Sequence, residues 1–254
     1  MLSLANKIGL VVGIANDRSI AYGCAKAFRQ AGASLAVTYL NDKAHSYVAP
    51  LASELGAELV LPCDVEQPEQ LSATFDAIAQ RYGRLDFLLH SIAYAPKVDL
   101  NGRLIDSSRD GFARAMDISC HSFLRMARLA EPLMASGGAL LTVSYYGAEK
   151  VVDNYGLMGP VKAALECAAI YMANELGPCG IRVNVLSPGP IVTRAASGIP
   201  EFSALVDATA RRAPARQLAD VGDVGAMAAF LVSDLAANIT GNITFIDAGY
   251  HVVA

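Results

Sequence analysis

The residues of this chain with the clearest potential for chemistry are Tyr155 and Lys162, which stand seven positions apart. On an α-helix of 3.6 residues per turn, positions separated by seven lie on one face about two turns apart, so the phenol and the ammonium group would share one pocket. A nearby cation stabilises phenolate over phenol and would make the tyrosine a better acid near neutral pH. An arbitrary pair at this spacing is more often a core tyrosine and an unrelated surface lysine. The surrounding segments must therefore decide.

Composition places the pair in a compact globular protein. The chain has 254 residues, of which 54% are hydrophobic and 17% charged, and its net charge is −4. A chain of this length commonly forms one α/β domain, so we expect a single domain over residues 1–254. The absence of a basic run disfavours nucleic-acid binding. No leader-like segment precedes the first apolar run and no stretch of about 18 apolar residues occurs, so we expect a cytoplasmic protein without a membrane span.

Cysteine and histidine show no metal-binding or disulfide pattern. The five cysteines are scattered without a Cys-x-x-Cys pair, and the four histidines form no His-x-x-x-His cluster. We therefore expect reduced thiols and no metal site. His90 falls within an apolar run and is interpreted as a structural residue.

Short apolar runs alternate with longer amphipathic segments along the chain. This alternation predicts an α/β fold: a Rossmann-like, doubly wound parallel sheet with right-handed crossovers and helices on both faces. The predicted strands, about seven, cover residues 8–13, 34–39, 58–61, 86–91, 139–143, 181–186 and 243–246. The predicted helices lie near residues 19–31, 42–55, 67–82, 111–135, 155–177 and 222–234. Pro50 should kink or shorten the second helix.

One long insertion interrupts the alternation. After the strand that ends near Leu186, a loop rich in proline runs to Pro200, and a helical pattern follows to about Arg212. Open α/β sheets bind ligands at the carboxyl ends of their strands, and long loops there often close over the site. We therefore expect residues 188–212 to form a substrate lid.

The end of the first predicted strand has features of a nucleotide-binding edge. Gly13 would let the backbone approach a pyrophosphate, and a helix that begins near Ser19 would offer free N–H groups to it. The signal is weak by itself, because no Gly-x-Gly-x-x-Gly motif is present and Ser19 could simply cap an ordinary helix. Asp64, after the third strand, could accept a hydrogen bond from an adenine amino group or merely cap the next helix.

Several segments together resemble the enoyl-acyl-carrier-protein reductases, which are divergent members of the short-chain dehydrogenase/reductase family. The Tyr-x6-Lys spacing is wider than the Tyr-x-x-x-Lys of ordinary family members and is typical of the enoyl reductases. The resemblance covers essentially the whole chain, and its segments are Gly13 to Ala21, Asp64-Val65, His90 to Pro96, Tyr145, Tyr155 to Lys162, Tyr171 to Pro178 and Gly189 to Thr193.

The resemblance implies reduction of a trans-2-enoyl thioester, linked to acyl carrier protein or coenzyme A, in fatty acid synthesis. Hydride addition at the β carbon makes an enolate, and a donor aimed at its oxygen stabilises the transition state more than the substrate. By resemblance, Tyr155 is this donor, Lys162 holds the nicotinamide ribose, and Tyr145 is a second tyrosine of the active site. The resemblance also implies a homotetramer built on the helices predicted at 111–135 and 155–177.

The same resemblance implies the remaining contacts. The residues expected to bind the cofactor are Gly13, Ser19, Ile20, Leu40, Asp64, Val65, Ser91, Ile92, Ala93, Lys162, Ile191 and Thr193, and those expected to contact the substrate are Ala95, Tyr145, Tyr155 and Met158. A 2′-phosphate normally requires an arginine or a basic cluster after the second strand, where this chain has Asp42. We therefore expect NADH rather than NADPH, although Lys43 could turn inward.

Three features depart from the family pattern. Ala93 stands where glycine is usual, and its methyl group could narrow the pocket. Pro160 would disturb the geometry of the tyrosine and the lysine if it lay beyond the first turn of its helix. The lid helix lacks the basic residues that family members often present to an acidic carrier protein; a substitute patch could come from Arg194, Arg211, Arg212 and Arg216.

Two other functions fit the same fold: a carbonyl or alcohol dehydrogenase, and a catalytically idle nucleotide-binding regulator. The spacing of Tyr155 and Lys162 and the presence of Tyr145 favour the enoyl reductase over the dehydrogenase. Retention of both catalytic residue types speaks against the idle regulator. The fold alone separates none of the three functions.

Overall fold

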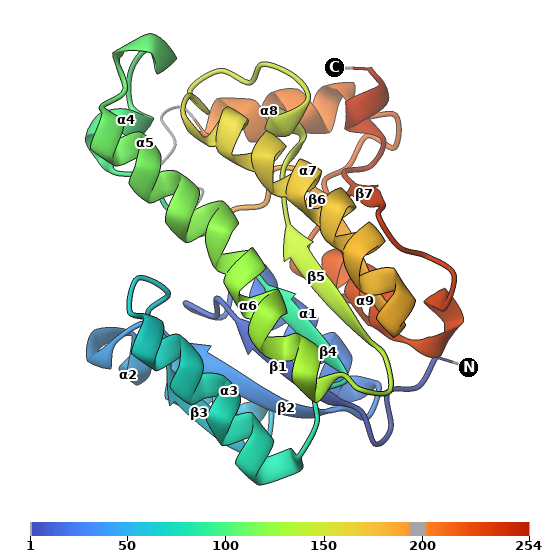
Figure 1. Cartoon of the computed structure of the whole chain (residues 1–254). Helices are drawn as coiled ribbons and strands as arrows, with labels where there is room; N and C mark the ends of the chain where they lie inside the picture. The colour runs from blue at the N-terminus through green and yellow to red at the C-terminus, as the bar shows by residue number, and fades with distance from the viewer. Residues whose placement is uncertain (1, 194–201, 254) are drawn as a thin grey trace.

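The computed structural model describes residues 2–193 and 202–253. Within these residues, seven parallel strands form one sheet in the order β3-β2-β1-β4-β5-β6-β7 (Figure 1). The strand order reverses between β1 and β4, which is the kind of position where doubly wound sheets bind ligands. The strands are β1 (Ile8–Val12), β2 (Ser34–Tyr39), β3 (Leu59–Pro62), β4 (Phe87–His90), β5 (Gly138–Val143), β6 (Ile181–Pro188) and β7 (Ile243–Ile246).

Helices cover both faces of the sheet, because successive strand residues point to opposite sides and both sides are apolar. Val11 of β1 packs in a cluster with α1, α2 and α9, whereas its neighbours Leu10 and Val12 pack with α3, α6 and α7. No helix of the described residues is both long and apolar enough to cross a membrane. The predicted Rossmann-like fold is confirmed. The α-helices are α1 (Ile20–Gln30), α2 (Asp42–Glu54), α3 (Pro68–Tyr82), α4 (Lys97–Leu100), α5 (Arg109–Met116), α6 (Ser122–Ala130), α7 (Met158–Leu176), α8 (Phe202–Arg212) and α9 (Val221–Val232).

The helix predicted over residues 111–135 is not continuous. Between α5 and α6, residues Asp117–His121 form a π-helical segment, and Glu131–Leu133 form a short 3₁₀ turn after α6. The Ser122 hydroxyl donates to the backbone oxygen of Ile118 at 2.6 Å, the kind of local bond that bends a helix. Apolar periodicity does not encode such a bond. The π-helical segment was therefore not predictable from the pattern.

The helix predicted to begin at Tyr155 begins at Met158 instead. Asn154 and Gly156 have φ values of 61° and 45°, in the left-handed region that a right-handed helix cannot contain. Tyr155 therefore lies in a turn before α7, and the prediction that it shares a helical face with Lys162 is wrong. Pro160 is the third residue of α7, in the first turn, where a missing N–H removes no helical hydrogen bond.

The second helix is not shortened by its proline. Pro50 lies inside α2, which runs on to Glu54. The predicted lid is described only in part: β6 ends at Pro188 and α8 begins at Phe202, and residues 194–201, which include Arg194, lie outside the described residues. Just after α8, Ala213 is buried in a cluster with Tyr146 and Tyr250. The residue that follows α8 thus packs against the C-terminal segment.

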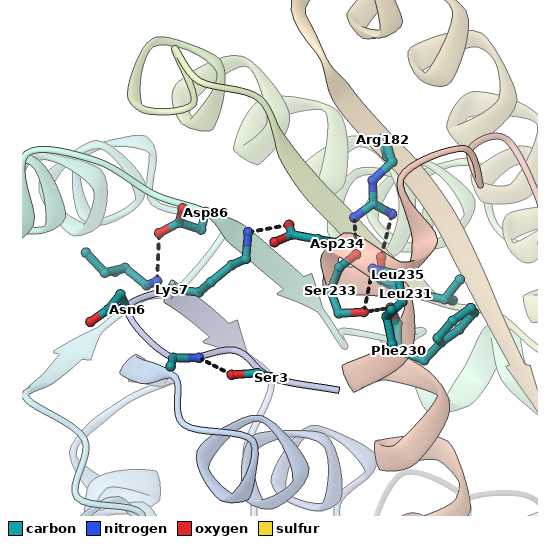
Figure 2. Close-up of polar contacts among 12 residues, drawn as sticks. Ser3, Asn6, Lys7, Asp86, Arg182, Phe230, Leu231, Ser233, Asp234 and Leu235 are labelled. Atoms are coloured by element: carbon teal, nitrogen blue, oxygen red, sulfur yellow. Dashed lines mark hydrogen bonds and ion pairs between the residues drawn. The ribbon is translucent and has the colours of Figure 1, made fainter. Parts of the chain in front are cut away.

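At the edge of the sheet where the strands begin, polar side chains bond to α9 and to the segment that follows it (Figure 2). Lys7 Nζ lies 2.7 Å from Asp234 Oδ1, which joins the residue before β1 to the segment after α9. Arg182, near the start of β6, donates to the backbone oxygens of Leu231 and Ser233 at 2.5 Å and 3.2 Å. These contacts have structural roles. A ligand site is therefore expected at the opposite edge, where the strands have their carboxyl ends.

Candidate active site

A cavity of about 430 Å³ opens where the carboxyl ends of β1, β4, β5 and β6 meet. Its wall includes Val143 at the end of β5 and Pro188 at the end of β6. All but three of the residues predicted to bind cofactor or substrate line this cavity: Gly13, Ser19, Ile20, Ser91, Ile92, Ala93, Ala95, Tyr145, Tyr155, Met158, Lys162, Ile191 and Thr193.

Leu40, Asp64 and Val65 lie elsewhere on the same edge of the sheet. Leu40 follows β2 and is exposed, and Val65 is buried in the core beyond β3. Asp64 Oδ1 accepts the backbone N–H of Glu66 at 3.0 Å, a bond in the turn before α3, whose N-cap residue is Gln67 rather than Asp64. A carboxylate can accept more than one such bond, so this contact leaves Asp64 with further capacity to accept.

Gly13 allows two backbone segments to meet at the floor of the cavity. Its φ is 114°, and an added Cβ would lie 2.1 Å from the backbone oxygen of Ser91. Only glycine tolerates both conditions. The segment after β1 therefore packs directly on the segment after β4, as a bound dinucleotide would require of its cradle.

The amino end of α1 faces this cradle. Ser19 occupies the N-cap position, but its hydroxyl makes no capping bond to the helix; it donates to the backbone oxygen of Asn16 at 2.6 Å instead. The side chain of Ser19 therefore does not occupy the first N–H groups of α1. Because a helix amino terminus also carries partial positive charge, this arrangement fits a pyrophosphate group.

Two tyrosines stand together at the substrate side of the cavity. The rings of Tyr145 and Tyr155 lie 5.0 Å apart at 63°. The hydroxyl of Tyr145 is buried without a hydrogen-bond partner among the described residues. An unpaired buried hydroxyl that borders a cavity is suited to a bond with a polar ligand atom, because leaving it unpaired costs about 1–3 kcal/mol.

Both phenols stay protonated near neutral pH. Burial, together with the neighbouring Tyr145 and Glu166, raises the pKa of Tyr155, and burial raises the pKa of Tyr145. The expectation that a cation would make Tyr155 a stronger acid is therefore wrong, because the loss of hydration on burial is the largest influence on its pKa. Each tyrosine presents an O–H group, which is a hydrogen-bond donor.

Lys162 is buried on α7 with its ammonium group at the cavity. Nζ donates one hydrogen bond, to the backbone oxygen of Val143 at 2.6 Å. An ammonium group has three N–H donors, so two remain for other acceptors. Burial lowers the pKa of Lys162 to about 8, and the Glu166 carboxylate acts in the opposite direction. The lysine is therefore mainly charged at neutral pH but titrates just above it.

His90 is buried beside the site and neutral. Its Nδ1 and Nε2 each lie 2.8 Å from a hydroxyl, of Thr142 and Ser122 respectively. Because Ser122 gives its proton to Ile118, it must accept from Nε2–H, and Thr142 donates to Nδ1. Burial and the nearby Lys162 lower the pKa of His90 to about 3. These contacts agree with the expected structural role.

Two polar residues at the site were missed by the sequence reasoning. Ser144 lines the cavity and donates to Glu166 Oε1 at 2.5 Å. Glu166 is buried one helical turn after Lys162. The available signal was an acid four positions after the candidate lysine, on the same helical face.

The chain matches a family model described as enoyl-(acyl carrier protein) reductase over residues 13–251. It is 46% identical to enoyl-[acyl-carrier-protein] reductase [NADH] 1 of Rhizobium meliloti, over 97% of this chain and 91% of that protein. It is 44% identical to the corresponding NADH reductase of Nostoc sp., over 100% of this chain and 99% of that protein.

Solved structures of enoyl reductases agree with these sequence matches. The Bacillus cereus enoyl-acyl carrier protein reductase with NADP⁺ and indole naphthyridinone gives a TM-score of 0.97 at 44% identity, with 100% of both chains covered. The Anaplasma phagocytophilum reductase in complex with NAD gives 0.95 at 45% identity, covering 99% of this chain and 96% of that one. The chain therefore belongs to the enoyl-acyl-carrier-protein reductase family, as its motifs predicted.

Proposed function

We propose that the chain reduces the double bond of trans-2-enoyl thioesters with NADH in fatty acid synthesis. The observation that carries this proposal is the cavity in which two protonated, buried tyrosines stand beside Lys162, in a chain of the enoyl reductase family. The relatives named above are NADH-dependent reductases by name. No feature of the site favours the carbonyl dehydrogenase or the idle regulator over this reaction.

NADH, when bound, supplies a hydride to the β carbon of the substrate. Gly13 and the amino end of α1 provide a cradle for its pyrophosphate. Lys162 donates to the nicotinamide ribose with the N–H groups that Val143 does not use. The other residues proposed to hold the cofactor are Ser19, Ile20, Leu40, Asp64, Val65, Ser91, Ile92, Ala93, Ile191 and Thr193.

The chain's own contribution is made at the thioester oxygen. Negative charge develops there as the enolate forms, and the protonated phenol of Tyr155 donates a hydrogen bond to it. Tyr145, whose hydroxyl has no partner among the described residues, contacts the same substrate. Lys162 is buried, and around a buried charge electrostatic attraction is stronger than in water. Ala95 and Met158 complete the substrate wall.

We propose acyl carrier protein as the carrier of the thioester. The basic residues expected to meet it are partly engaged: Arg212 donates to the backbone oxygen of Val253 at 2.9 Å, and Arg216 bonds to the backbone oxygen of Arg211. Both contacts use backbone acceptors, so the guanidinium charges are not neutralised by them. The alternative carrier is coenzyme A, and the assay below compares the two carriers directly.

We further propose one reductase domain over residues 1–254, with residues 188–212 covering the substrate, and a homotetramer. The face of α7 turned away from the sheet leaves Ile170 and Tyr171 exposed by 47% and 68%. Large exposed apolar side chains on adjacent positions of a long helix fit a contact with another copy of the chain. The cytoplasmic location expected from the sequence stays a prediction.

The test is the loss of NADH absorbance with a short trans-2-enoyl thioester on coenzyme A and on acyl carrier protein. We expect turnover, a preference for the carrier protein, and a fall of at least about 10²-fold in kcat for Tyr155→Phe, since the hydrogen bond to the thioester oxygen is lost. Tyr146→Phe is the control, because Tyr146 is the buried neighbour of Tyr145 and packs against Tyr250 outside the cavity. Failure of every thioester to react with a protein that binds NADH would refute the proposal.

A further inference from the structure

The end of β5 meets α7 through two consecutive residues. The backbone oxygen of Val143 accepts from Lys162 Nζ at 2.6 Å, and the hydroxyl of the next residue, Ser144, donates to Glu166 Oε1 at 2.5 Å. The third residue in this row is Tyr145, which borders the cavity. The strand end that carries the second tyrosine is thus joined to the helix that carries the lysine.

Glu166 is an unusual residue for its position. It is only 8% exposed, and apart from Lys162 its buried neighbours on α7 are apolar, among them Leu165 and Ala169. Burying a carboxylate costs free energy unless it is hydrogen-bonded or paired, and an apolar side chain would fill such a place at least as stably. Packing alone therefore does not account for an acid here.

Two groups of the active site do account for it. Ser144 supplies the hydrogen bond, and Lys162 lies one turn earlier on the same helix, at the spacing where opposite charges attract. We propose, building on the enoyl reductase function, that Glu166 is a positioning residue: it holds Ser144 and so the direction of Tyr145, and it keeps the ammonium group of Lys162 charged. Glu166 itself does not line the cavity.

The effect on Lys162 has a defined sign. A carboxylate nearby favours the ammonium form, so its removal must lower the pKa of Lys162 below its present value of about 8. NADH binding through the charged lysine would then be lost at a lower pH than in the parent protein. The alkaline midpoint of NADH binding therefore reports on Glu166.

The other titratable groups around the pair do not obscure this readout. His90 on β4 has its pKa lowered to about 3 by burial and stays neutral. Burial raises the pKa of the Cys120 thiol in the π-helical segment and the pKa values of Tyr145 and Tyr155. Glu149, after the turn that follows β5, is exposed and is the remaining acid that acts on Glu166.

The experiment compares Glu166→Gln, Ser144→Ala and the control Glu175→Gln, an exposed acid on the same helix. The readouts are NADH affinity from pH 6 to 10, by ligand fluorescence, and kcat with the enoyl thioester. Glu166→Gln should move the alkaline midpoint of binding down by about one pH unit or more. Ser144→Ala keeps the carboxylate, so it should lower kcat about tenfold with little change in the midpoint. Glu175→Gln should match the parent protein.

An unchanged midpoint in folded Glu166→Gln would overturn the proposal. If Glu166→Gln does not fold, Ser144→Ala decides: it removes the same hydrogen bond with a smaller change, and an unaltered kcat would then refute the positioning role. Because the midpoint is measured by binding alone, a shifted midpoint in a protein without turnover would leave this inference standing while the enoyl reductase function fails.

Discussion

Gly13 is the residue on which the cofactor cradle most depends. Gly13→Ala places a methyl group 2.1 Å from the backbone oxygen of Ser91, at a φ of 114° that alanine rarely adopts. Strain of this kind costs about 1–3 kcal/mol before the clash is added. We expect the free energy of unfolding to fall by about 3 kcal/mol and NADH affinity to fall at least tenfold, as measured by denaturant unfolding and NADH titration.

Gly83→Ala is the matched control for this prediction. Gly83 ends α3 with a φ of 70°, but an added Cβ would meet no atom of the described residues within 4 Å. This variant should lose only the conformational term, about 1 kcal/mol, and should bind NADH like the parent protein. Equal losses in the two variants would show that the contact with Ser91 is unimportant.

The sequence located most of the cavity-lining residues but not their chemistry. Residues as distant as Gly13 and Thr193 meet because parallel strands place their carboxyl ends on one edge, which the alternating pattern predicts. The protonation of Tyr155 and the pKa of Lys162 depend instead mainly on burial, which the sequence pattern does not show. Glu166 was missed because an acid on a helix usually marks a solvated face, and only the packing shows that it is buried.

The π-helical segment between α5 and α6 fixes the loop that follows β4. Ser119 accepts the backbone N–H of Tyr94 at 2.8 Å and donates to its backbone oxygen at 2.9 Å. Ala93 and Ala95, on either side of Tyr94, line the cavity. A rare helix form thus sets the shape of one wall of the site, as π-helical turns often do.

We predict that Ser119→Ala loosens this wall. Both backbone groups of Tyr94 would lose their partner, at a cost of about 1–3 kcal/mol. Amide hydrogen exchange in residues 91–95 should therefore accelerate about tenfold to a hundredfold, with a several-fold rise in KM for the thioester. Ser46→Ala is the control, because Ser46 also donates to a backbone oxygen, that of Lys43, but at an exposed position of α2. Exchange in the loop that does not differ between the two variants would contradict the assignment.

Element type was predicted better than element boundaries. Each predicted strand is present, because buried parallel strands appear as continuous apolar runs bounded by polar or glycine residues. The helix predicted at 155–177 begins three residues late, since Asn154 and Gly156 take left-handed conformations that its apolar pattern does not reveal. At the break at Asp117–His121, hydroxyl groups bond both within the helix, from Ser122 to Ile118, and to the distant Tyr94. Helical periodicity records neither kind of bond.

Several polar groups at the two edges of the sheet differ in whether they are already hydrogen-bonded. At the edge where strands begin, Lys7 and Arg182 are engaged with the segment after α9 (Figure 2). At the opposite edge, the buried hydroxyl of Tyr145 has no hydrogen-bond partner among the described residues, and Lys162 has two N–H donors besides the one bonded to Val143. Satisfied polar groups at one edge stabilise the fold, and available ones at the other edge are the groups that can bind ligand.

The outer face of α7 provides the last prediction, because it bears on how many copies act together. Sedimentation of the parent protein at micromolar concentration should give a species of about four times the 26.6 kDa chain. Replacing Ile170 and Tyr171 together by aspartate puts two charges on the exposed apolar face, and desolvating them in an interface would be costly. The double variant should sediment as a smaller species. Gln80→Glu, on an exposed position of α3, should not change the mass. A parent protein that sediments as a monomer would refute the tetramer.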